Sequence, residues 1–306
     1  MKKLYDMIII GGGPAGYSAA LYAARAGFDT VVVERLSPGG QMALTDVIDN
    51  YPGFDEGVDG FTLGMKMQQG AERFGAQTVY EEVVSTKLCE KIKSVSTIKN
   101  TYYGKVVMIA TGAEHRMLGI EDEALLTGRG VSYCATCDGM FYKGKNVVVV
   151  GGGNSAVADA LVLSRIANKV MIVHRRDTLR ATKLYHEQLM QTENVEFYWD
   201  SIVTKLISDG KLTHVNIQNV KTKEEQLLEA DGLFVSIGRS PVTNVFSEQI
   251  RCDENGYIIA DETTCTNIPG VYAIGDVRTK EVRQIVTAAS DGAVAAHYAE
   301  KYLLEE

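Results

Sequence analysis

Short apolar runs that lead into glycine-rich turns occur twice along this chain. The first run, residues 5–10, leads into the turn 11–16, and the small residues of Tyr17–Ala26 then predict a helix. A second apolar run, Thr30–Val33, ends at Glu34. Runs of about four to eight apolar residues bounded by glycine are typical of buried parallel strands. The pattern predicts a strand–turn–helix–strand unit.

The second copy of this pattern lies near the middle of the chain. The apolar run 147–150 leads into the turn 151–156, and a later strand, 170–173, ends before His174. The separation between Gly151 and His174 in the sequence equals the separation between Gly11 and Glu34. Two copies in the same context make plain surface turns a poor explanation, and they favour two dinucleotide-binding units.

Further apolar runs set the expected domain limits. They predict strands at 105–110, 233–237 and 270–274, each followed by glycine. Because the second copy lies between the first two of these strands, we expect an α/β fold with two Rossmann-like dinucleotide-binding domains, one inserted into the other. The expected limits are residues 1–113 and 241–306 for the outer domain and 114–240 for the inserted one.

Charge and hydropathy exclude several functions. The 31 Lys and Arg residues against 39 Asp and Glu give a net charge of −8, which argues against a nucleic-acid surface. No apolar run approaches the roughly 18 residues of a membrane span. The apolar start is interrupted by Asp6 and is too short for a secretory signal. We therefore expect a cytoplasmic protein that binds neither nucleic acid nor membrane.

The glycine turns have the spacing that a bound pyrophosphate requires. The first glycine allows the tight bend, the second lets the backbone approach the phosphates, and the third small residue lets the helix pack on the strand. These positions are occupied by Gly11, Gly13 and Gly16 in the first copy and by Gly151, Gly153 and Ala156 in the second.

The residue that ends the second strand differs between the copies. The carboxylate of Glu34 suits ribose hydroxyls, as in FAD or NAD. His174 is followed by Arg175 and Arg176 and then by Arg180, and guanidinium groups bind a 2′-phosphate. The alternative is a solvated basic turn, but at this position of a dinucleotide fold the arginines favour NADPH.

A Cys-x-x-Cys pair, Cys134 and Cys137, precedes the second turn and suits a dithiol–disulfide couple. A zinc site would need further soft ligands, and no second such pair exists, so we expect no metal. Asp138 follows the pair and is either a turn residue or a group that exchanges a proton with a thiolate. The isolated cysteines are expected to be ordinary packed thiols; they are Cys89, Cys252 and Cys265.

Together these motifs resemble the bacterial, low-molecular-weight type of thioredoxin reductase within the pyridine nucleotide-disulfide oxidoreductases. The matching segments are 11–16, 39–41, 50–54, 110–113, 131–139, 151–156, 174–180, 273–277 and 283–284. The cysteine pair next to the second nucleotide turn is the most specific feature, because the larger reductases of the glutathione type carry their cysteines in the FAD domain.

The resemblance implies an NADPH-dependent thioredoxin-disulfide reductase that contains FAD. It implies that FAD contacts Gly11, Gly13, Pro14, Ala15, Gly16, Glu34, Arg35, Gly40, Gln41, Asn50, Thr111, Gly112, Gly275, Asp276, Arg283 and Gln284. It implies that NADPH contacts Gly151, Gly153, Asn154, Ser155, Ala156, His174, Arg175, Arg176, Arg180 and Arg239.

The resemblance also implies roles for the redox residues. Cys137 would face the flavin, Cys134 would attack the disulfide of thioredoxin or a thioredoxin-like protein, and Asp138 would act as acid and base. It further implies a homodimer and a rotation of one domain on the other, which we expect to hinge near 112–113 and 238–241. Two residues depart from the family pattern, His115 and Tyr133, and Tyr133 is placed to alter contact with the partner.

Four other functions fit the sequence less well than this one. A peroxiredoxin-system reductase usually has extra N-terminal domains, for which a first turn at residue 11 leaves no room. The arginine cluster counts against a dithiol oxidase that uses oxygen. A ferredoxin–NADP reductase would lack the cysteine pair, and a non-catalytic flavin or NADPH sensor would not need it.

Overall fold

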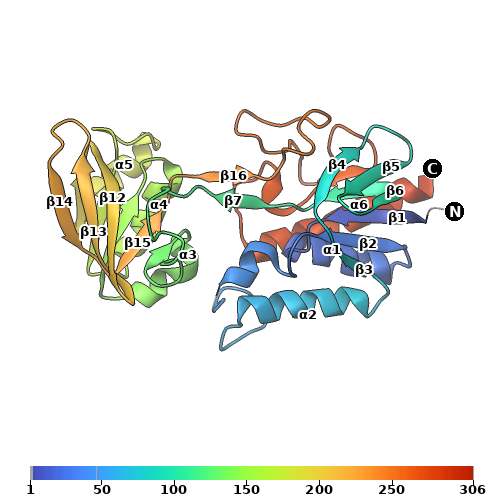
Figure 1. The fold of residues 1–306 in the computed structure, drawn as a ribbon, viewed down its shortest axis with the longest axis horizontal. Helices are drawn as coiled ribbons and strands as arrows, with labels where there is room; N and C mark the ends of the chain where they lie inside the picture. The colour runs from blue at the N-terminus through green and yellow to red at the C-terminus, as the bar shows by residue number, and fades with distance from the viewer. Residues whose placement is uncertain (1–2, 46, 306) are drawn as a thin grey trace. The chain divides into compact units, whose positions relative to one another are not determined.

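The computed structural model describes residues 3–45 and 47–305, and the chain forms two compact units (Figure 1). Unit 1 consists of Met1–Glu114 and Ser240–Glu306, and unit 2 is His115–Arg239. The chain therefore leaves unit 1, completes unit 2 and then returns. The predicted α/β class with two Rossmann-like units is confirmed.

A mixed sheet forms the centre of unit 1. Within the described residues it has seven strands in the order β3-β2-β1-β6-β5-β4, with β17 also paired to β6. β3, β2, β1, β6 and β17 run parallel, whereas β4, β5 and β6 form an antiparallel meander. The strands are β1 (Leu4–Ile10), β2 (Thr30–Glu34), β3 (Gln77–Tyr80), β4 (Val83–Lys87), β5 (Lys93–Thr97), β6 (Thr101–Ile109) and β17 (Val271–Ala273).

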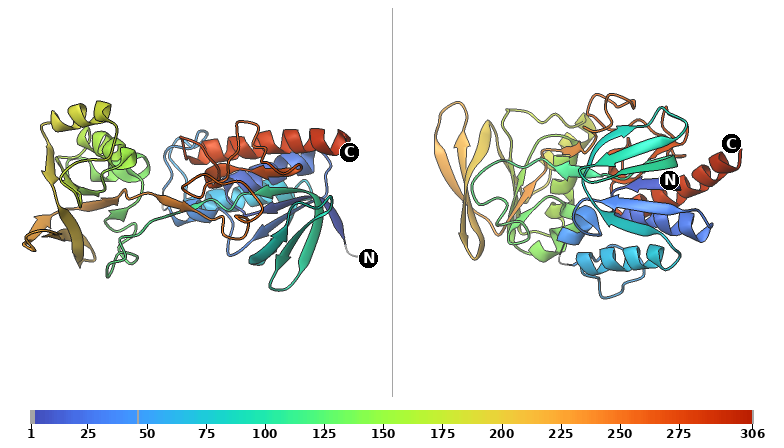
Figure 2. Two further views of the ribbon diagram at one scale, coloured as in Figure 1. Left: turned by 90° about the horizontal axis from the view of Figure 1, so that it is seen from above. Right: turned by 45° about the vertical axis from the view of Figure 1, so that its right-hand side comes forward.

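The helices of unit 1 are α1 (Pro14–Arg25), α2 (Gly60–Glu72) and α6 (Ile285–Glu305), with short 3-10 turns η1 (Gly40–Leu44) and η3 (Gly275–Val277). α1 begins three residues before the predicted Tyr17, because Pro14 occupies the first helical turn, where proline is favoured. Its buried side chains are mostly alanines, so α6 packs closely along it (Figure 2). α6 thus covers the helix that follows the first glycine turn.

Unit 2 is built on a parallel sheet that, in the part of the chain the structure describes, has five strands in the order β11-β10-β9-β15-β8. A separate antiparallel sheet contains β12, β13 and β14. The strands are β8 (Val131–Ser132), β9 (Asn146–Val150), β10 (Lys169–Val173), β11 (Val195–Tyr198), β12 (Ser201–Asp209), β13 (Lys211–Asn219), β14 (Glu225–Glu229) and β15 (Gly232–Val235). The helices are α3 (Ala135–Asp138), η2 (Gly139–Tyr142), α4 (Asn154–Ser164) and α5 (Lys183–Met190).

Two short strands carry the chain across the boundary between the units. β7 (Ala113–His115) and β16 (Arg239–Pro241) pair with each other in a two-stranded sheet. Glycines with positive φ precede both strands, Gly112 at 70° and Gly238 at 103°. The two crossings therefore form one hydrogen-bonded ribbon. None of the described helices is long and apolar enough to cross a membrane.

Candidate active site

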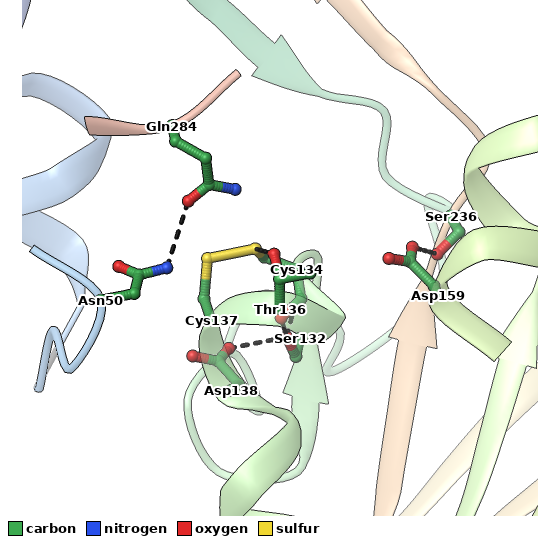
Figure 3. The surroundings of a disulfide bond; sticks show 9 residues. All are labelled: Asn50, Ser132, Cys134, Thr136, Cys137, Asp138, Asp159, Ser236 and Gln284. Carbon is green, nitrogen blue, oxygen red and sulfur yellow. Dashed lines mark hydrogen bonds between the residues drawn. A yellow bond between two sulfur atoms is a disulfide. The ribbon is translucent and has the colours of Figure 1, made fainter. Parts of the chain in front are cut away.

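The cysteine pair of unit 2 forms a disulfide between Cys134 and Cys137, with a Cα–Cα distance of 5.3 Å (Figure 3). Cys134 has an extended backbone and stands at the start of the short helix α3. Its carbonyl oxygen accepts the backbone N–H groups of Cys137 and Asp138, at 3.2 and 3.1 Å. The tight turn closed by these bonds brings the two sulfurs within bonding distance.

A serine and a carboxylate hold this turn on one side. Ser132 Oγ donates to Asp138 Oδ2 at 2.6 Å and accepts the backbone N–H of Cys134 at 3.1 Å (Figure 3). Because the buried Ser132 bonds to both, Asp138 is fixed next to the redox turn. Ser132 is a residue that the sequence alone did not single out.

The first glycine turn has the shape that a dinucleotide pyrophosphate needs. Gly11 has φ of 106°, and a Cβ there would overlap the carbonyl oxygen of Ala110. A Cβ at Gly16 would overlap the carbonyl oxygen of Gly11, so α1 approaches the turn closely. At Gly13 a Cβ would meet nothing within 4 Å. The turn is therefore closed towards the sheet and open at the start of α1, which fits a bound phosphate.

The Glu34 carboxylate is fixed above this turn. Glu34 Oε2 accepts the Gly12 N–H at 2.6 Å and Oε1 accepts the Leu36 N–H at 2.9 Å. Glu34 lies at the carboxyl end of β2 and is partly exposed. A carboxylate in this place is suited to ribose hydroxyls, as FAD presents them.

The second glycine turn repeats the geometry of the first. Gly151 has φ of 148°, and a Cβ there would overlap the carbonyl oxygen of Ser236. Gly153, like Gly13, has open space where a Cβ would lie. The first two residues of α4, Asn154 and Ser155, are exposed, and Asn154 Oδ1 accepts the Thr182 N–H at 3.0 Å. This turn also fits a pyrophosphate.

His174 occupies the place that Glu34 has in the first copy. Its buried ring lies against Gly152, where a Cβ would overlap it, and its Nε2 atom has no hydrogen-bond partner among the described residues. Burial lowers the pKa of His174, and the charge of Arg180 lowers it further. Both effects disfavour the protonated imidazole, and the three arginines supply positive charge at this strand end.

Those arginines are accessible. Arg175, Arg176 and Arg180 are all exposed, and the Arg180 backbone N–H donates to the Gly152 carbonyl at 2.6 Å. The Arg180 segment is therefore fixed beside the glycine turn, although the two segments are far apart in the sequence. A cluster of exposed guanidinium groups at this position fits the 2′-phosphate of NADPH.

Further predicted residues of unit 1 lie in loops and at the start of a 3-10 turn. Asn50 Nδ2 donates to Gln284 Oε1 at 3.2 Å (Figure 3), which joins two segments that are 234 positions apart in the sequence. The Arg283 guanidinium lies 4.2 Å from the centre of the Tyr257 ring. Gly40 and Gln41 begin η1 and are exposed.

Two predicted residues have contacts that serve the fold. Thr111 Oγ1 donates to the Val242 carbonyl at 2.7 Å, and the Gly112 carbonyl accepts the Val242 N–H at 3.0 Å. These bonds join the chain that leaves unit 1 to the chain that returns. The guanidinium of Arg35 is exposed and 4.0 Å from the Glu114 carboxylate.

A buried charge cluster in unit 1 was not predicted. Asp291 on α6 accepts bonds from Arg278 at 2.9 and 3.0 Å, from Lys280 at 2.9 Å and from the Gly275 N–H at 2.8 Å. Burial alone would raise the pKa of Asp291, but the bonds from Arg278 and Lys280 hold it below its ordinary value. Asp291 thus fixes Gly275, the first residue of η3. A lone aspartate in an alanine-rich helix is the only sequence signal for it.

Two dinucleotide turns and a redox-active cysteine pair define a flavin- and nicotinamide-dependent disulfide oxidoreductase. The family model described as pyridine nucleotide-disulphide oxidoreductase matches residues 5–292, and the chain belongs to this family. Members of the family use FAD and NADPH.

Curated relatives agree with this assignment. The chain is 47% identical to the thioredoxin reductase of Listeria innocua serovar 6a, over 99% of this chain and 95% of that protein. It is 43% identical to the thioredoxin reductase of Bacillus subtilis strain 168, over 99% of this chain and 96% of that one.

Solved structures show the same similarity. A thioredoxin reductase from Streptococcus pyogenes superposes with a TM-score of 0.94 at 43% identity, covering all of both chains. A thioredoxin reductase from Lactococcus lactis, described as in the FR conformation, has a TM-score of 0.70 at 43% identity, covering 99% of this chain and all of that one.

Proposed function

We propose that this enzyme is an NADPH-dependent thioredoxin-disulfide reductase that acts through Cys134 and Cys137. The observation that carries the proposal is the disulfide between these residues, placed in the unit that holds the second glycine turn. The names of relatives that match nearly the whole chain at 43–47% identity support it.

The two units are assigned to the two cofactors. Unit 1, with Glu34 fixed over its turn, would hold FAD through the residues that the family resemblance implies, from Gly11 to Gln284. Unit 2, with its exposed arginines, would hold NADPH. The difference in charge at the two strand ends supports this assignment.

The chemistry at the cysteines follows from their arrangement. When bound, NADPH and FAD supply the electron pair that reduces the disulfide. Cys134, as a thiolate, then attacks the partner's disulfide and forms a mixed disulfide. Cys137 displaces the partner's sulfur, so that the partner leaves as a dithiol and the Cys134–Cys137 disulfide forms again. Asp138, held by Ser132, would exchange the protons of these steps.

A protein is the partner that the surroundings of the disulfide suit. Met140 and Phe141 follow the redox turn in η2, and their side chains are 63% and 50% exposed. Large exposed apolar side chains are typical of surfaces that bind proteins. We propose thioredoxin or a thioredoxin-like protein as this partner and a homodimer as the working assembly.

A cytoplasmic location is part of the same proposal. The thiols of Cys89 and Cys265 are free and exposed. Thiols of this kind persist in a reducing compartment. A thioredoxin system that is supplied with NADPH requires the same compartment.

The proposal includes a domain rotation during turnover. The cysteines and the NADPH turn belong to one unit, and both have to reach the same flavin. The two relatives with equal identity but TM-scores of 0.94 and 0.70 support more than one arrangement within the family. The hinge would lie at Gly112 and Gly238, whose positive φ values favour glycine.

The test begins with NADPH added to the purified yellow protein under nitrogen. We expect the flavin absorbance to bleach, two new thiols to appear, and oxidised thioredoxin to restore the original spectrum. In Cys134→Ser the flavin should still bleach, but thioredoxin reduction should fall by roughly 1,000-fold or more, because the attacking thiolate is gone. Bleaching without reoxidation by thioredoxin would assign another disulfide partner, and no bleaching would refute the NADPH assignment.

A further inference from the structure

The buried charge cluster of unit 1 contains one anion and two cations. Its centre is Asp291 on α6, and its cations are Arg278 and Lys280. The three side chains are at most 8% exposed. Glu262 lies 3.7 Å from Arg278 but is 97% exposed, so it is largely solvated. Burying charges is costly unless their hydrogen bonds are satisfied, and the contacts of Asp291 therefore show what the cluster does.

The Asp291 carboxylate receives hydrogen bonds from four different donor atoms. Its Oδ2 atom accepts bonds from Arg278 Nε, Lys280 Nζ and the Gly275 N–H, and its Oδ1 atom accepts one from Arg278 Nη2. An ionised carboxylate only accepts, so it can take all four bonds at once. An asparagine amide in the same place would set its own donor against one of these donors. The position therefore suits an ionised aspartate.

The cluster lies where α6 and η3 both contact the start of α1. A Cβ on Gly292, the residue after Asp291, would overlap the Ala15 carbonyl oxygen. A Cβ on Gly275 would lie 3.0 Å from the Ala15 Cβ. The bond between Asp291 and the Gly275 N–H thus joins α6 to η3 beside the first glycine turn, where α1 begins.

The same cluster also holds the loop 281–286. Lys280 Nζ donates to the Thr287 carbonyl at 3.3 Å, which joins the two ends of this loop. The Arg278 carbonyl accepts a bond from Arg283 Nη2 at 3.4 Å. Both segments that Asp291 holds therefore contain residues that the family resemblance assigns to FAD, namely Gly275, Asp276, Arg283 and Gln284.

We propose that Asp291 is a positioning residue for FAD. It holds η3 and the loop 281–286 in the arrangement that accepts the cofactor. A binding site that adopts its competent arrangement for only part of the time has an apparent dissociation constant that is larger by the inverse of that fraction. The inference rests on the assignment of FAD to unit 1 and is independent of the thioredoxin half-reaction.

The net positive charge of the cluster offers a different route to the same cofactor. Two cations against one anion would attract the pyrophosphate whatever their exact positions. Position and charge predict opposite results for Asp291→Asn, which removes the anion and breaks the network. Arg278→Lys keeps the charge but loses the two-pronged contact with the carboxylate. Lys280→Met removes a cation but leaves three of the four bonds to Asp291.

The matched control is Asp6→Asn in the same unit. Asp6 likewise accepts a backbone N–H, from Asp29 at 3.1 Å, and a lysine, from Lys105 at 2.7 Å. It lies near the amino end of β1, whereas the glycine turn follows the carboxyl end of that strand. Loss of these bonds should therefore leave the cofactor site unchanged.

Two quantities are measured in the full-length yellow protein. The first is the dissociation constant for FAD, from the fluorescence of free FAD in the filtrate of a dilution series. The second is hydrogen–deuterium exchange of the peptide that contains the Gly275 amide, with FAD added to saturation. Neither measurement needs thioredoxin or NADPH. Failure of the wild type to bind FAD would refute the cofactor assignment, and with it this inference.

We expect D291N to raise the dissociation constant for FAD at least roughly tenfold and to speed exchange at Gly275. R278K should raise the constant by roughly three- to tenfold, K280M should stay within about threefold, and D6N should match the wild type. Tighter FAD binding in D291N would overturn the proposal in favour of charge. An equal rise in D6N would overturn it in favour of general stability. If D291N does not fold, R278K decides, since an unchanged dissociation constant there would also overturn the proposal.

Discussion

The two glycine turns have nearly the same backbone but different surroundings. In unit 1, Ala15 at the start of α1 is buried. Its Cβ lies close to Gly275, and its carbonyl oxygen lies so close to Gly292 of α6 that a Cβ on Gly292 would overlap it. In unit 2 the corresponding residues, Asn154 and Ser155, are exposed. Both turns have open space at their second glycine, but the first turn of α1 packs against Gly275 and α6 of its own unit, whereas the first residues of α4 are exposed.

This difference matches the two kinds of nucleotide that the family uses. FAD stays bound through many turnovers, so a turn whose helix is held by α6 and η3 suits it. NADPH binds and leaves in each cycle, so an open turn with exposed arginines suits it. The same strand–turn–helix unit thus serves as a cofactor site or a substrate site, and its surroundings decide between them.

The largest expected effect on nucleotide binding comes from adding a methyl group to each glycine turn in separate variants. Gly13→Ala and Gly153→Ala each add a methyl group where there is open space and a negative φ, so both variants should fold. Gly13→Ala should lose FAD on gel filtration and become colourless. Gly153→Ala should stay yellow while its KM for NADPH rises at least roughly tenfold, which corresponds to about 1.4 kcal/mol.

Each variant of this pair is the control for the other. Loss of the yellow colour in both, or in neither, would contradict the assignment of one nucleotide to each turn. The absorbance spectrum after gel filtration and steady-state kinetics with varied NADPH measure the two outcomes directly.

A smaller effect is expected at the second strand end. Arg175→Ala and Arg176→Ala should each raise KM for NADPH by roughly tenfold, because a hydrogen bond between charged groups contributes about 1.5–3 kcal/mol. KM for NADH should stay nearly constant, since NADH has no 2′-phosphate. An equal rise for both nucleotides would show that the arginines act on general binding, and Arg165→Ala, away from this strand end on the same unit, is a control.

The sequence predicted the parts of the site that depend on neighbouring residues. The glycine turns, the strand-end residues Glu34 and His174, and the Cys134–Cys137 pair are all local, because a few consecutive residues determine each backbone path. The run of small residues predicts the start of α1 at Tyr17, three residues late, because Pro14 occupies the first helical turn, where its fixed φ is favourable.

The parts that were missed depend on contacts between distant segments. The Asp159 carboxyl on α4 accepts a hydrogen bond from Ser236, 77 residues away, and each alone is an ordinary helix or loop residue. In the same way, the two departures from the family pattern, His115 and Tyr133, turn out to stack on each other with ring centres 4.9 Å apart. No local pattern links such residues, because their contact exists only after the sheet of unit 2 has formed.

That stacked pair belongs to unit 2 alone and gives the smallest predicted effect. Burial, with the charge of Arg239, lowers the pKa of His115 to about 4. The unfolded chain, with a histidine pKa near the ordinary value of about 6.5, therefore binds a proton that the folded protein excludes between these values. The contribution of His115 to stability is fully present above about pH 6.5 and falls as the pH falls towards 4.

Between pH 7 and pH 5 the free energy of unfolding of the wild type should therefore fall. We expect the free energy of unfolding of His115→Gln, whose side chain does not titrate, to fall by roughly 1–2 kcal/mol less. Urea unfolding at the two pH values measures this difference, with the exposed His297→Gln on α6 as control. Equal losses in His115→Gln and the wild type would mean that folding does not lower the pKa of His115.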